Sequence, residues 1–165
     1  MALMVSNEQF AQIKDNKIFS DILFADLQVR SWFLPAQFHI SNCAFRNCFL
    51  GNEVNFHRGV FKNVTFQDCE FEGVNFESLI LTNTEFHNCK FRGGCVFNLA
   101  MFNNCKFNNC FIVGTDFSNA QLIGTTFNRG SFVYNNIDGL KYHVTGDLFN
   151  NIEEYLGNTG NIKRI

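Results

Sequence analysis

The sequence is short of several features that most enzymes and membrane proteins share. Its 165 residues include one proline and one tryptophan, and only 17% of them are charged. Its apolar runs fall far short of the ~20 residues that a membrane-spanning helix needs. It has no P-loop, GxGxxG, GxSxG or HExxH motif and no zinc-binding spacing, so the common catalytic and cofactor signatures are missing. The net charge of −2 also argues against direct binding of nucleic acid.

Cysteine and histidine offer no catalytic or metal-binding pattern either. The seven cysteines contain no CxxC pair, and an odd number cannot all be paired in disulfides. The N-terminal residues do not follow a signal-peptide pattern, so we expect a reducing, cytoplasmic location. The four histidines are scattered, and no two carboxylates are placed for acid–base chemistry. The sequence therefore predicts no enzyme, no metal site and no cofactor.

What the sequence does have is a large apolar residue at every fifth position from Ile40 to Ile137. A helix repeats every 3.6 residues and a half-buried strand every two, so neither explains this period. We call the large residue of each unit its centre; fourteen of the twenty centres are phenylalanine, and two steps are six residues long. The centres are Ile40, Phe45, Leu50, Phe56, Phe61, Phe66, Phe71, Phe76, Leu81, Phe86, Phe91, Phe97, Phe102, Phe107, Ile112, Phe117, Leu122, Phe127, Phe132 and Ile137.

Two other positions of each unit are restricted. Two residues before most centres the chain is small, as at Cys69 and Ala100, and extended backbone sends residues two apart to the same side. Two residues after the centre, Asn, Gly or Asp occupies fifteen of the twenty positions. Because these residues tolerate left-handed or turn geometry, each unit is predicted to be a short extended piece that ends in a corner.

Units such as Val74–Ser78 (VNFES) and Thr115–Asn119 (TDFSN) combine these features. Residues 40–137 thus resemble the pentapeptide-repeat family, whose consensus is a small residue, Asp or Asn, Leu or Phe, and two variable positions. The resemblance implies an all-β fold: a right-handed quadrilateral β-helix, or solenoid, with four units per coil. We therefore expect about five coils over residues 40–139, flanked by short terminal helices.

The order of the residues supports four units per coil. Both six-residue steps then fall on the same side, and one column of centres contains only phenylalanine: Phe45, Phe66, Phe86, Phe107 and Phe127. Opposite charges also fall on neighbouring coils, which in-register stacking favours. These pairs are Glu70 with Lys90, Glu72 with Arg92, and Glu85 with Lys106.

All seven cysteines occupy the small inward position, and four of them share one column. A thiolate ladder for metal or redox chemistry is one interpretation. The interpretation we favour is that cysteine acts as a small buried hydrophobe, because no imidazole or carboxylate shares that column. The four are Cys48, Cys69, Cys89 and Cys110.

The two ends of the chain differ from the repeats. Residues 1–39 are expected to form a cap, in which Ser6 and Gln9 fit a capping box for a helix over about 7–14. Ser20-Asp21-Ile22 and Ala25-Asp26-Leu27 resemble two further repeat units and indicate a partial coil. Residues 140–165 are expected to form a helix and tail that cap the last coil, make a dimer contact, or both. The apolar stripe of this helix is Leu148, Phe149, Ile152, Tyr155 and Leu156.

The outside of the predicted rod offers two candidate interaction surfaces. Residues 40–137 contain seven acidic and seven basic side chains, which makes electrostatic mimicry of DNA weak, but a small acidic zone remains. An outward apolar stripe is unexpected on a soluble rod. Either a terminal segment of this chain covers the stripe, or the stripe binds another protein or a second copy of this chain. The zone is Asp68, Glu70, Glu72 and Glu77; the stripe is Val60, Ile80, Met101 and Ile123.

We therefore expect a non-catalytic protein that binds another protein through its surface. Some pentapeptide-repeat proteins protect DNA gyrase or topoisomerase IV from inhibitors. The resemblance accordingly implies a bacterial type II topoisomerase as the partner, quinolone resistance as an outcome, and a homodimer. The alternative is a structural, scaffold or regulatory interaction module that is unrelated to topoisomerase.

Overall fold

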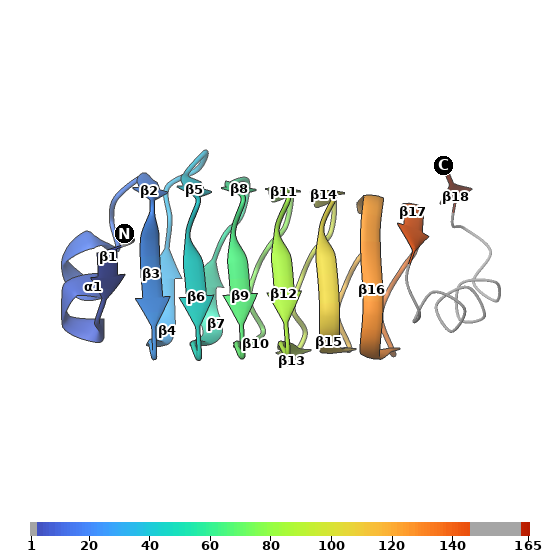
Figure 1. The fold of residues 1–165 in the computed structure, drawn as a ribbon. Helices are drawn as coiled ribbons and strands as arrows, with labels where there is room; N and C mark the ends of the chain where they lie inside the picture. Colours follow the sequence, from blue (N-terminus) through green and yellow to red (C-terminus); the bar gives the residue numbers. More distant parts are fainter. Residues whose placement is uncertain (1–2, 146–162) are drawn as a thin grey trace.

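The computed structural model describes residues 3–145 and 163–165, and these form a parallel β-solenoid with one short helix at its N-terminal end (Figure 1). The chain winds around four faces, which we number in the order in which each coil visits them. Every pairing between strands of neighbouring coils is parallel and joins equivalent residues. The β-helix expected from the five-residue period is thereby confirmed.

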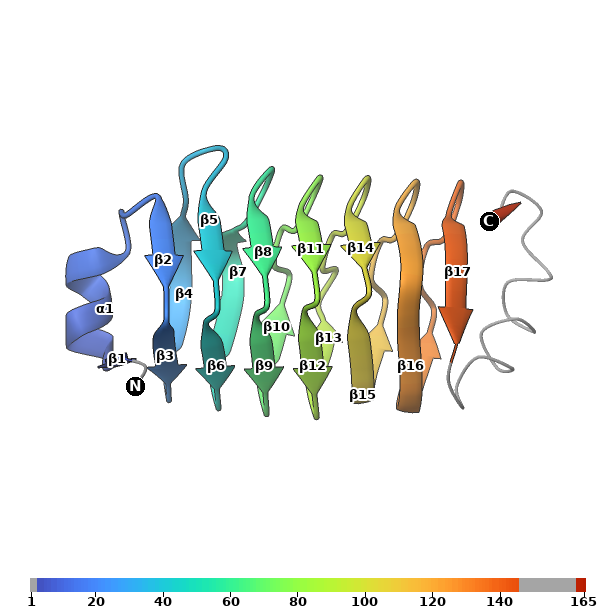
Figure 2. The same cartoon turned by 45° about the horizontal axis from the view of Figure 1, so that its top comes forward.

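The strands of the first two faces stack in two adjoining rows along the rod (Figure 2). Face 1 consists of β2 (Ile18–Ser20), β5 (His39–Ser41), β8 (Val60–Lys62), β11 (Ile80–Thr82), β14 (Met101–Asn103), the start of β16 (Gln121–Val133), β17 (Lys141–Thr145) and β18 (Lys163–Arg164). Face 2 consists of β1 (Leu3–Val5), β3 (Ile22–Ala25), β6 (Ala44–Arg46), β9 (Thr65–Gln67), β12 (Glu85–His87), the start of β15 (Lys106–Val113) and the middle of β16.

The remaining two faces complete each coil. Face 3 consists of β4 (Gln28–Phe33), β7 (Phe49–Asn55), β10 (Glu70–Glu72), β13 (Lys90–Arg92) and the ends of β15 and β16. Face 4 is held by isolated bridges that join Asn55, Asn75, Val96, Asp116 and Asn136. β15 continues from face 2 to face 3 and β16 runs from face 1 to face 3, so these three faces form one sheet.

The rod has about seven turns, more than the five expected, because Ile18–Phe33 forms a coil before the repeats and β17 starts another after them. The centres of the first coil are Phe19, Phe24 and Val29, which stack on the centres of the next coil. Residues 1–39 therefore supply more than a partial coil. The five-residue period begins one coil before Ile40, with a smaller β-branched residue at its third unit.

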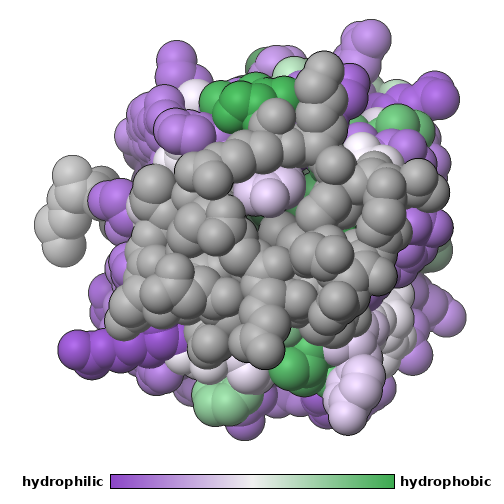
Figure 3. Space-filling view, turned by 90° about the vertical axis from the view of Figure 1, so that its right-hand side faces the viewer, coloured by the Kyte–Doolittle hydropathy of each residue, from purple (hydrophilic) through white to green (hydrophobic). Residues whose placement is uncertain are grey.

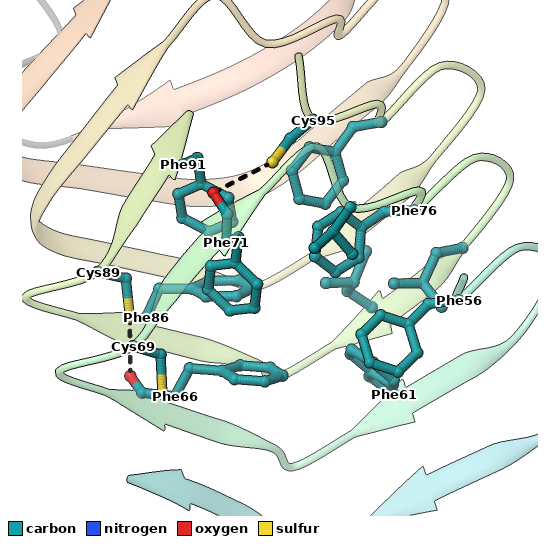
Figure 4. Close-up of a cluster of buried hydrophobic side chains, with 14 of the residues drawn as sticks. Phe56, Phe61, Phe66, Cys69, Phe71, Phe76, Phe86, Cys89, Phe91 and Cys95 are labelled. Carbon is teal, nitrogen blue, oxygen red and sulfur yellow. Dashed lines mark hydrogen bonds between the residues drawn. The ribbon is translucent and has the colours of Figure 1, made fainter. Parts of the chain in front are cut away.

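The interior is a stack of phenylalanine rings (Figure 4). In the all-phenylalanine column of face 2, successive ring centroids lie 4.7 to 5.0 Å apart from Phe45 to Phe127, and the rings are nearly parallel. Phe71 and Phe91 of face 3 stack in the same way, at 4.6 Å. Because each buried ring removes about 150–250 Å² from water, this stack is the main source of stability.

The corners between faces use left-handed backbone, as the Asn, Gly and Asp positions predict. Asn42, Asn63 and Asn83 have φ of 52°, 54° and 50°. Asparagine also adds a bond between coils: the Asn63 amide donates to Asn42 at 3.0 Å, and the Asn83 amide donates to Asn63 at 3.2 Å. The second six-residue step places its extra residue in the left-handed pair Gly93 and Gly94.

The short N-terminal helix expected from the capping box is present. Helix α1 (Asn7–Ile13) starts at Ser6, whose backbone N–H donates to the Gln9 side chain at 3.0 Å while its hydroxyl accepts from the Gln9 N–H. The Phe10 ring packs edge-on against Trp32, with centroids 4.7 Å apart, and closes the first coil. The apolar stripe from Leu148 to Leu156 lies outside the described residues. In the described part of the chain, no helix is long and apolar enough to cross a membrane.

Candidate interaction surfaces

Three apolar side chains stack in register on the outside of face 1. Ile80 pairs with Val60 on one side and with Met101 on the other. Ile80 is 39% exposed, and the other two are half-buried. We call Val60, Ile80 and Met101 the apolar ladder. Ile123 does not belong to the apolar ladder. The ladder residues directly precede the centres of face 1, whereas Ile123 directly follows its centre and pairs with Asn103. We call the residues that follow these centres the second outer line of face 1.

Polar side chains surround the apolar ladder. His39 pairs with Val60 at one end, and Gln121 pairs with Met101 at the other. The second outer line of the face carries Lys62, Thr82 and Asn103. A compact apolar centre with a polar rim is the arrangement found at protein–protein contacts.

The described N-terminal segment does not cover the apolar ladder. Helix α1 lies at the end of the rod, where Phe10 packs on Phe24 and Trp32 of the first coil (Figure 1). Val60, the nearest ladder residue, lies two coils further along face 1 than β2. The sequence left open that an N-terminal or a C-terminal segment covers the apolar ladder. The described N-terminal residues are therefore excluded as its cover.

The four acidic residues expected to form one zone are divided between faces. Glu70 and Glu72 lie on β10 of face 3, and Arg92 of the next coil pairs with both, at 2.6 Å from Glu72. Glu77 lies beyond the next corner, where its carboxylate is 3.4 Å from His57. Asp68 accepts a hydrogen bond of 3.0 Å from the Asn88 amide. The structure thus brings only two of these carboxylates together, and one guanidinium compensates both.

The three predicted charge pairs are in register. Lys106 donates to Glu85 at 2.6 Å, and His87 lies 2.9 Å from the other Glu85 oxygen. These contacts, that with Lys106 first, lower the pKa of Glu85 below its usual value. The partner of Glu70 differs from the prediction, because Arg92 reaches it although Lys90 is the residue in register. The guanidinium has five donors in a fork, so it can bind two carboxylates at once.

Face 3 also exposes apolar side chains, on either side of its charged residues. Phe111 is 50% exposed, and Val113 stacks on Val133. Phe49 lies before the charged coils, and the Arg30 guanidinium sits 5.3 Å from its ring centroid. Seen from the C-terminal end, the rim of the rod is largely hydrophilic with separate hydrophobic patches (Figure 3). No single face is apolar along its whole length.

The repeat pattern and the stacked coils agree with a known family. Residues 60–98 and 100–133 match the model of pentapeptide repeats in eight copies. The repeat segment of this chain belongs to the pentapeptide-repeat family. No curated protein matches the chain.

Solved structures of other pentapeptide-repeat proteins resemble the chain over most of its length. A trypsin-treated QnrB1, described as a plasmid-mediated fluoroquinolone resistance protein, is 14% identical, with a TM-score of 0.45 over 95% of this chain and 98% of that one. Rfr23 from the cyanobacterium Cyanothece is 11% identical, with a TM-score of 0.36 over 86% and 97%. HetL from the cyanobacterium Nostoc is 13% identical, with a TM-score of 0.25 over 86% and 79%.

The seven cysteines of this pentapeptide-repeat protein are all buried and free. Six of the thiols donate to backbone carbonyls of the coil before, for example Cys89 to Phe66 at 3.5 Å (Figure 4), and Cys43 donates to Ser41 of its own coil. Burial raises the pKa of Cys95 and of Cys105 to about 11, so both are protonated at neutral pH. Burial of all seven, and protonation of Cys95 and Cys105, agree with the interpretation of cysteine as a small interior residue. In the column of four, hydrogen bonds from Cys48 and Cys89 lower the pKa of Cys69, and a bond from Cys89 lowers that of Cys110. In the described part of the chain, no three His, Cys, Asp or Glu residues are grouped to hold a metal ion.

A polar groove on face 2 went unnoticed in the sequence. It is an open depression of about 780 Å³ at the outer edge of face 2 and its corner with face 3. Its lining is Thr65, Gln67, His87, Asn88, Asn108, Asn109, Asn128 and Arg129. The residues directly after the phenylalanine centres of face 2 are Gln67, His87, Asn108 and Asn128. Aligning the residues that follow these centres in the sequence would therefore have indicated a continuous polar line.

Proposed function

We propose that this protein acts without catalysis, by binding another protein along the outside of its solenoid, and that its partner is a bacterial type II topoisomerase such as DNA gyrase. Phenylalanine rings fill the interior of the coils, so recognition falls to the four outer faces. Pentapeptide-repeat proteins are generally structural or interaction proteins, which supports a role in binding. We also infer a cytoplasmic location, because free thiols persist in a reducing compartment.

The apolar ladder is the observation that carries the proposal. Val60, Ile80 and Met101 are held in fixed positions on three consecutive rungs, about 4.8 Å apart. Rigid backbone places them for docking at a low entropic cost. Burying such a ladder against a partner contributes about 25 cal/mol for each Å² of apolar surface removed from water.

Charge argues against imitation of DNA as the mode of binding. Five coils between residues 40 and 137 span about 24 Å, over which duplex DNA carries about 14 negative charges. This segment contains seven acidic and seven basic residues, and Arg92 alone compensates two of the acids. We therefore propose that shape and apolar contact, rather than negative charge, hold the partner. The neutral surface also supports the second candidate, a scaffold or regulatory module for a different protein.

The decisive experiment compares two variants of strand β11. Ile80→Asp places a carboxylate in the apolar ladder, whereas Thr82→Asp places the same charge two residues away, on the second outer line of face 1. In a gyrase supercoiling assay with a quinolone, wild type and Thr82→Asp should preserve activity at micromolar concentration. Ile80→Asp should require at least about tenfold more protein, because it buries a charge in the contact.

Each other outcome has a distinct meaning. Failure of the wild type to affect gyrase, with or without the quinolone, rejects topoisomerase as the partner. Equal protection by both variants rejects the apolar ladder as the contact. Circular dichroism of both variants checks the fold: loss of structure in Ile80→Asp alone would indicate that part of this chain covers the ladder.

Dimerisation through the stripe from Leu148 to Leu156 stays a prediction. A charged residue in its middle, Ile152→Asp, should convert a dimer into a monomer in light scattering coupled to size exclusion, since apolar homodimer contacts do not tolerate a buried charge. A wild type that is monomeric at high micromolar concentration would contradict the dimer.

A further inference from the structure

The groove on face 2 is lined mainly by side-chain amides. Five of its eight lining residues carry side-chain amides, together with an imidazole, a hydroxyl and the guanidinium of Arg129. Four successive coils contribute to it, so it extends about 14 Å along the rod. We propose that this groove binds a neutral oligosaccharide about three sugar residues long. The proposal does not depend on the protein partner, because the apolar ladder lies on face 1.

Hydrogen bonds between coils fix the orientation of the amides in the groove. The Asn128 amide donates to Asn108 at 3.0 Å, and the Asn108 amide donates to Nδ1 of His87 at 3.4 Å. Nδ1 of His87 thus accepts, so Nε2 carries the proton and donates to Glu85 at 2.9 Å. A directed chain runs from Asn128 to Glu85, and Lys106 compensates the charge at its end.

A second chain runs beside the first one, along the corner between faces 2 and 3. The Asn109 amide donates to Asn88 at 2.9 Å, and the Asn88 amide donates to Asp68 at 3.0 Å. Left-handed backbone holds Asn88 and Asn109, with φ of 53° at both. The two chains are parallel and repeat at the same interval, which produces a double line of amides.

The amides of Asn88 and Asn108 have bonding capacity left over for a ligand. A side-chain amide has two N–H donors and an oxygen with two lone pairs. The chains use one donor and one lone pair of Asn88 and of Asn108. A second donor and a second lone pair remain at each of these residues. Because their neighbours already hold these side chains in place, a ligand does not have to order them.

Neighbouring donors and acceptors without net charge match the hydroxyl groups of a sugar, since a hydroxyl donates one hydrogen bond and accepts two. The competing ligand classes fit less well. Nucleic acid needs several cations, and the lining carries only Arg129. An apolar small molecule needs an apolar lining, and a peptide needs apolar pockets for its anchor side chains. The lining has no phenylalanine, tyrosine or tryptophan ring for a sugar to stack on, so we expect a dissociation constant on the order of 1 mM.

The test uses the full-length protein and four linear sugars: cellotetraose, chitotetraose, maltotetraose and xylotetraose. Saturation-transfer NMR at millimolar sugar should detect binding of at least one of them. Asn108→Ala removes the amide that joins two coils of the groove and should weaken binding about tenfold. Asn103→Ala is the matched control, because Asn103 holds the equivalent position on face 1 and should leave binding unchanged.

Gln67→Ala serves as a second groove variant in case Asn108→Ala does not fold, since Gln67 is exposed at the edge of the groove. Weaker binding by either folded groove variant, with Asn103→Ala unchanged, supports the site. Absence of signal with all four sugars overturns the proposal. Equal binding by wild type and the folded groove variants also overturns it, as does stronger binding of tetragalacturonate than of any neutral sugar.

Discussion

Truncation of Phe86 to alanine is the most direct test of the aromatic interior. Phe86 is fully buried at the middle of the face 2 column. Its ring stacks on Phe66 at 5.0 Å and on Phe107 at 4.8 Å, and it meets Phe91 edge-on at 5.3 Å. Removing it leaves a cavity, because backbone hydrogen bonds on both sides fix the spacing of the coils.

The expected loss follows from these contacts. A buried Phe→Ala change costs about 3–5 kcal/mol in cavity and transfer terms. Each aromatic pair adds about 0.5–1.5 kcal/mol beyond area burial, although the pairs are not additive. We therefore expect a loss of about 4–5 kcal/mol in the free energy of unfolding. Phe86→Leu should cost about 1–2 kcal/mol, since leucine already serves as a centre at Leu81 between two phenylalanines.

Equilibrium unfolding in guanidinium chloride, followed by far-ultraviolet circular dichroism, measures these differences. Phe111→Ala is the control: it removes the same atoms from a half-exposed side chain and should cost less than about 1 kcal/mol. If Phe86→Ala cost no more than Phe111→Ala, the stacked rings would not be what stabilises the solenoid. Equal losses for Phe86→Ala and Phe86→Leu would instead show that the aromatic contacts, rather than filled volume, dominate.

Three further outcomes test a corner glycine, an ion pair and the buried thiols. Gly130→Ala should destabilise the protein by about 2–4 kcal/mol in thermal unfolding, because φ of Gly130 is +90° and the new Cβ would lie 2.0 Å from the Cys110 carbonyl oxygen of the coil before. Gly114→Ala is the control and should cost only about 1 kcal/mol, because its new Cβ would enter open space. Equal losses for the two variants would contradict this reasoning. Glu85→Gln should lower the melting temperature at neutral pH but not in acid. Because the pKa of Glu85 is lowered in the folded protein, the ionised carboxylate stabilises the fold above the usual carboxyl pKa, and this stabilisation is lost as the pH falls through the lowered pKa. A deficit that persists at low pH would argue against the Lys106 contact. The seven buried thiols should react with Ellman's reagent only after unfolding, and fast reaction of the native protein would contradict their burial.

Much of the fold could be predicted because its signal is local. The small residue, the centre and the corner residue of each unit lie within five positions, so the units follow from counting. The resemblance to the pentapeptide-repeat family implied four faces, and the columns and charge pairs supported that number. The capping box of α1 is equally local. The prediction failed in the first coil, where Asp21 and Asp26 were read as the second residues of repeat units. They are the left-handed corners, and the centres are Phe19 and Phe24.

The candidate sites were predicted less completely than the fold. Register placed Val60, Ile80 and Met101 in one line, and the structure confirms that line. Register also paired Glu70 with Lys90, but the ion pair forms with Arg92. The choice depends on side-chain length and on the fork of the guanidinium, neither of which appears in a repeat pattern.

The sequence by itself determined a five-residue repeat that places its phenylalanines in columns, because each unit carries its own centre and corner; the resemblance to the pentapeptide-repeat family implied the closed column of four faces. Only the tertiary structure decided which side chains of neighbouring coils bind each other. The ion pairs of Arg92 and the directed amide chain through Asn108 depend on rotamers and on distances between rungs. Those contacts turn a repeated exterior into distinct surfaces, one with an apolar ladder and one with a polar groove.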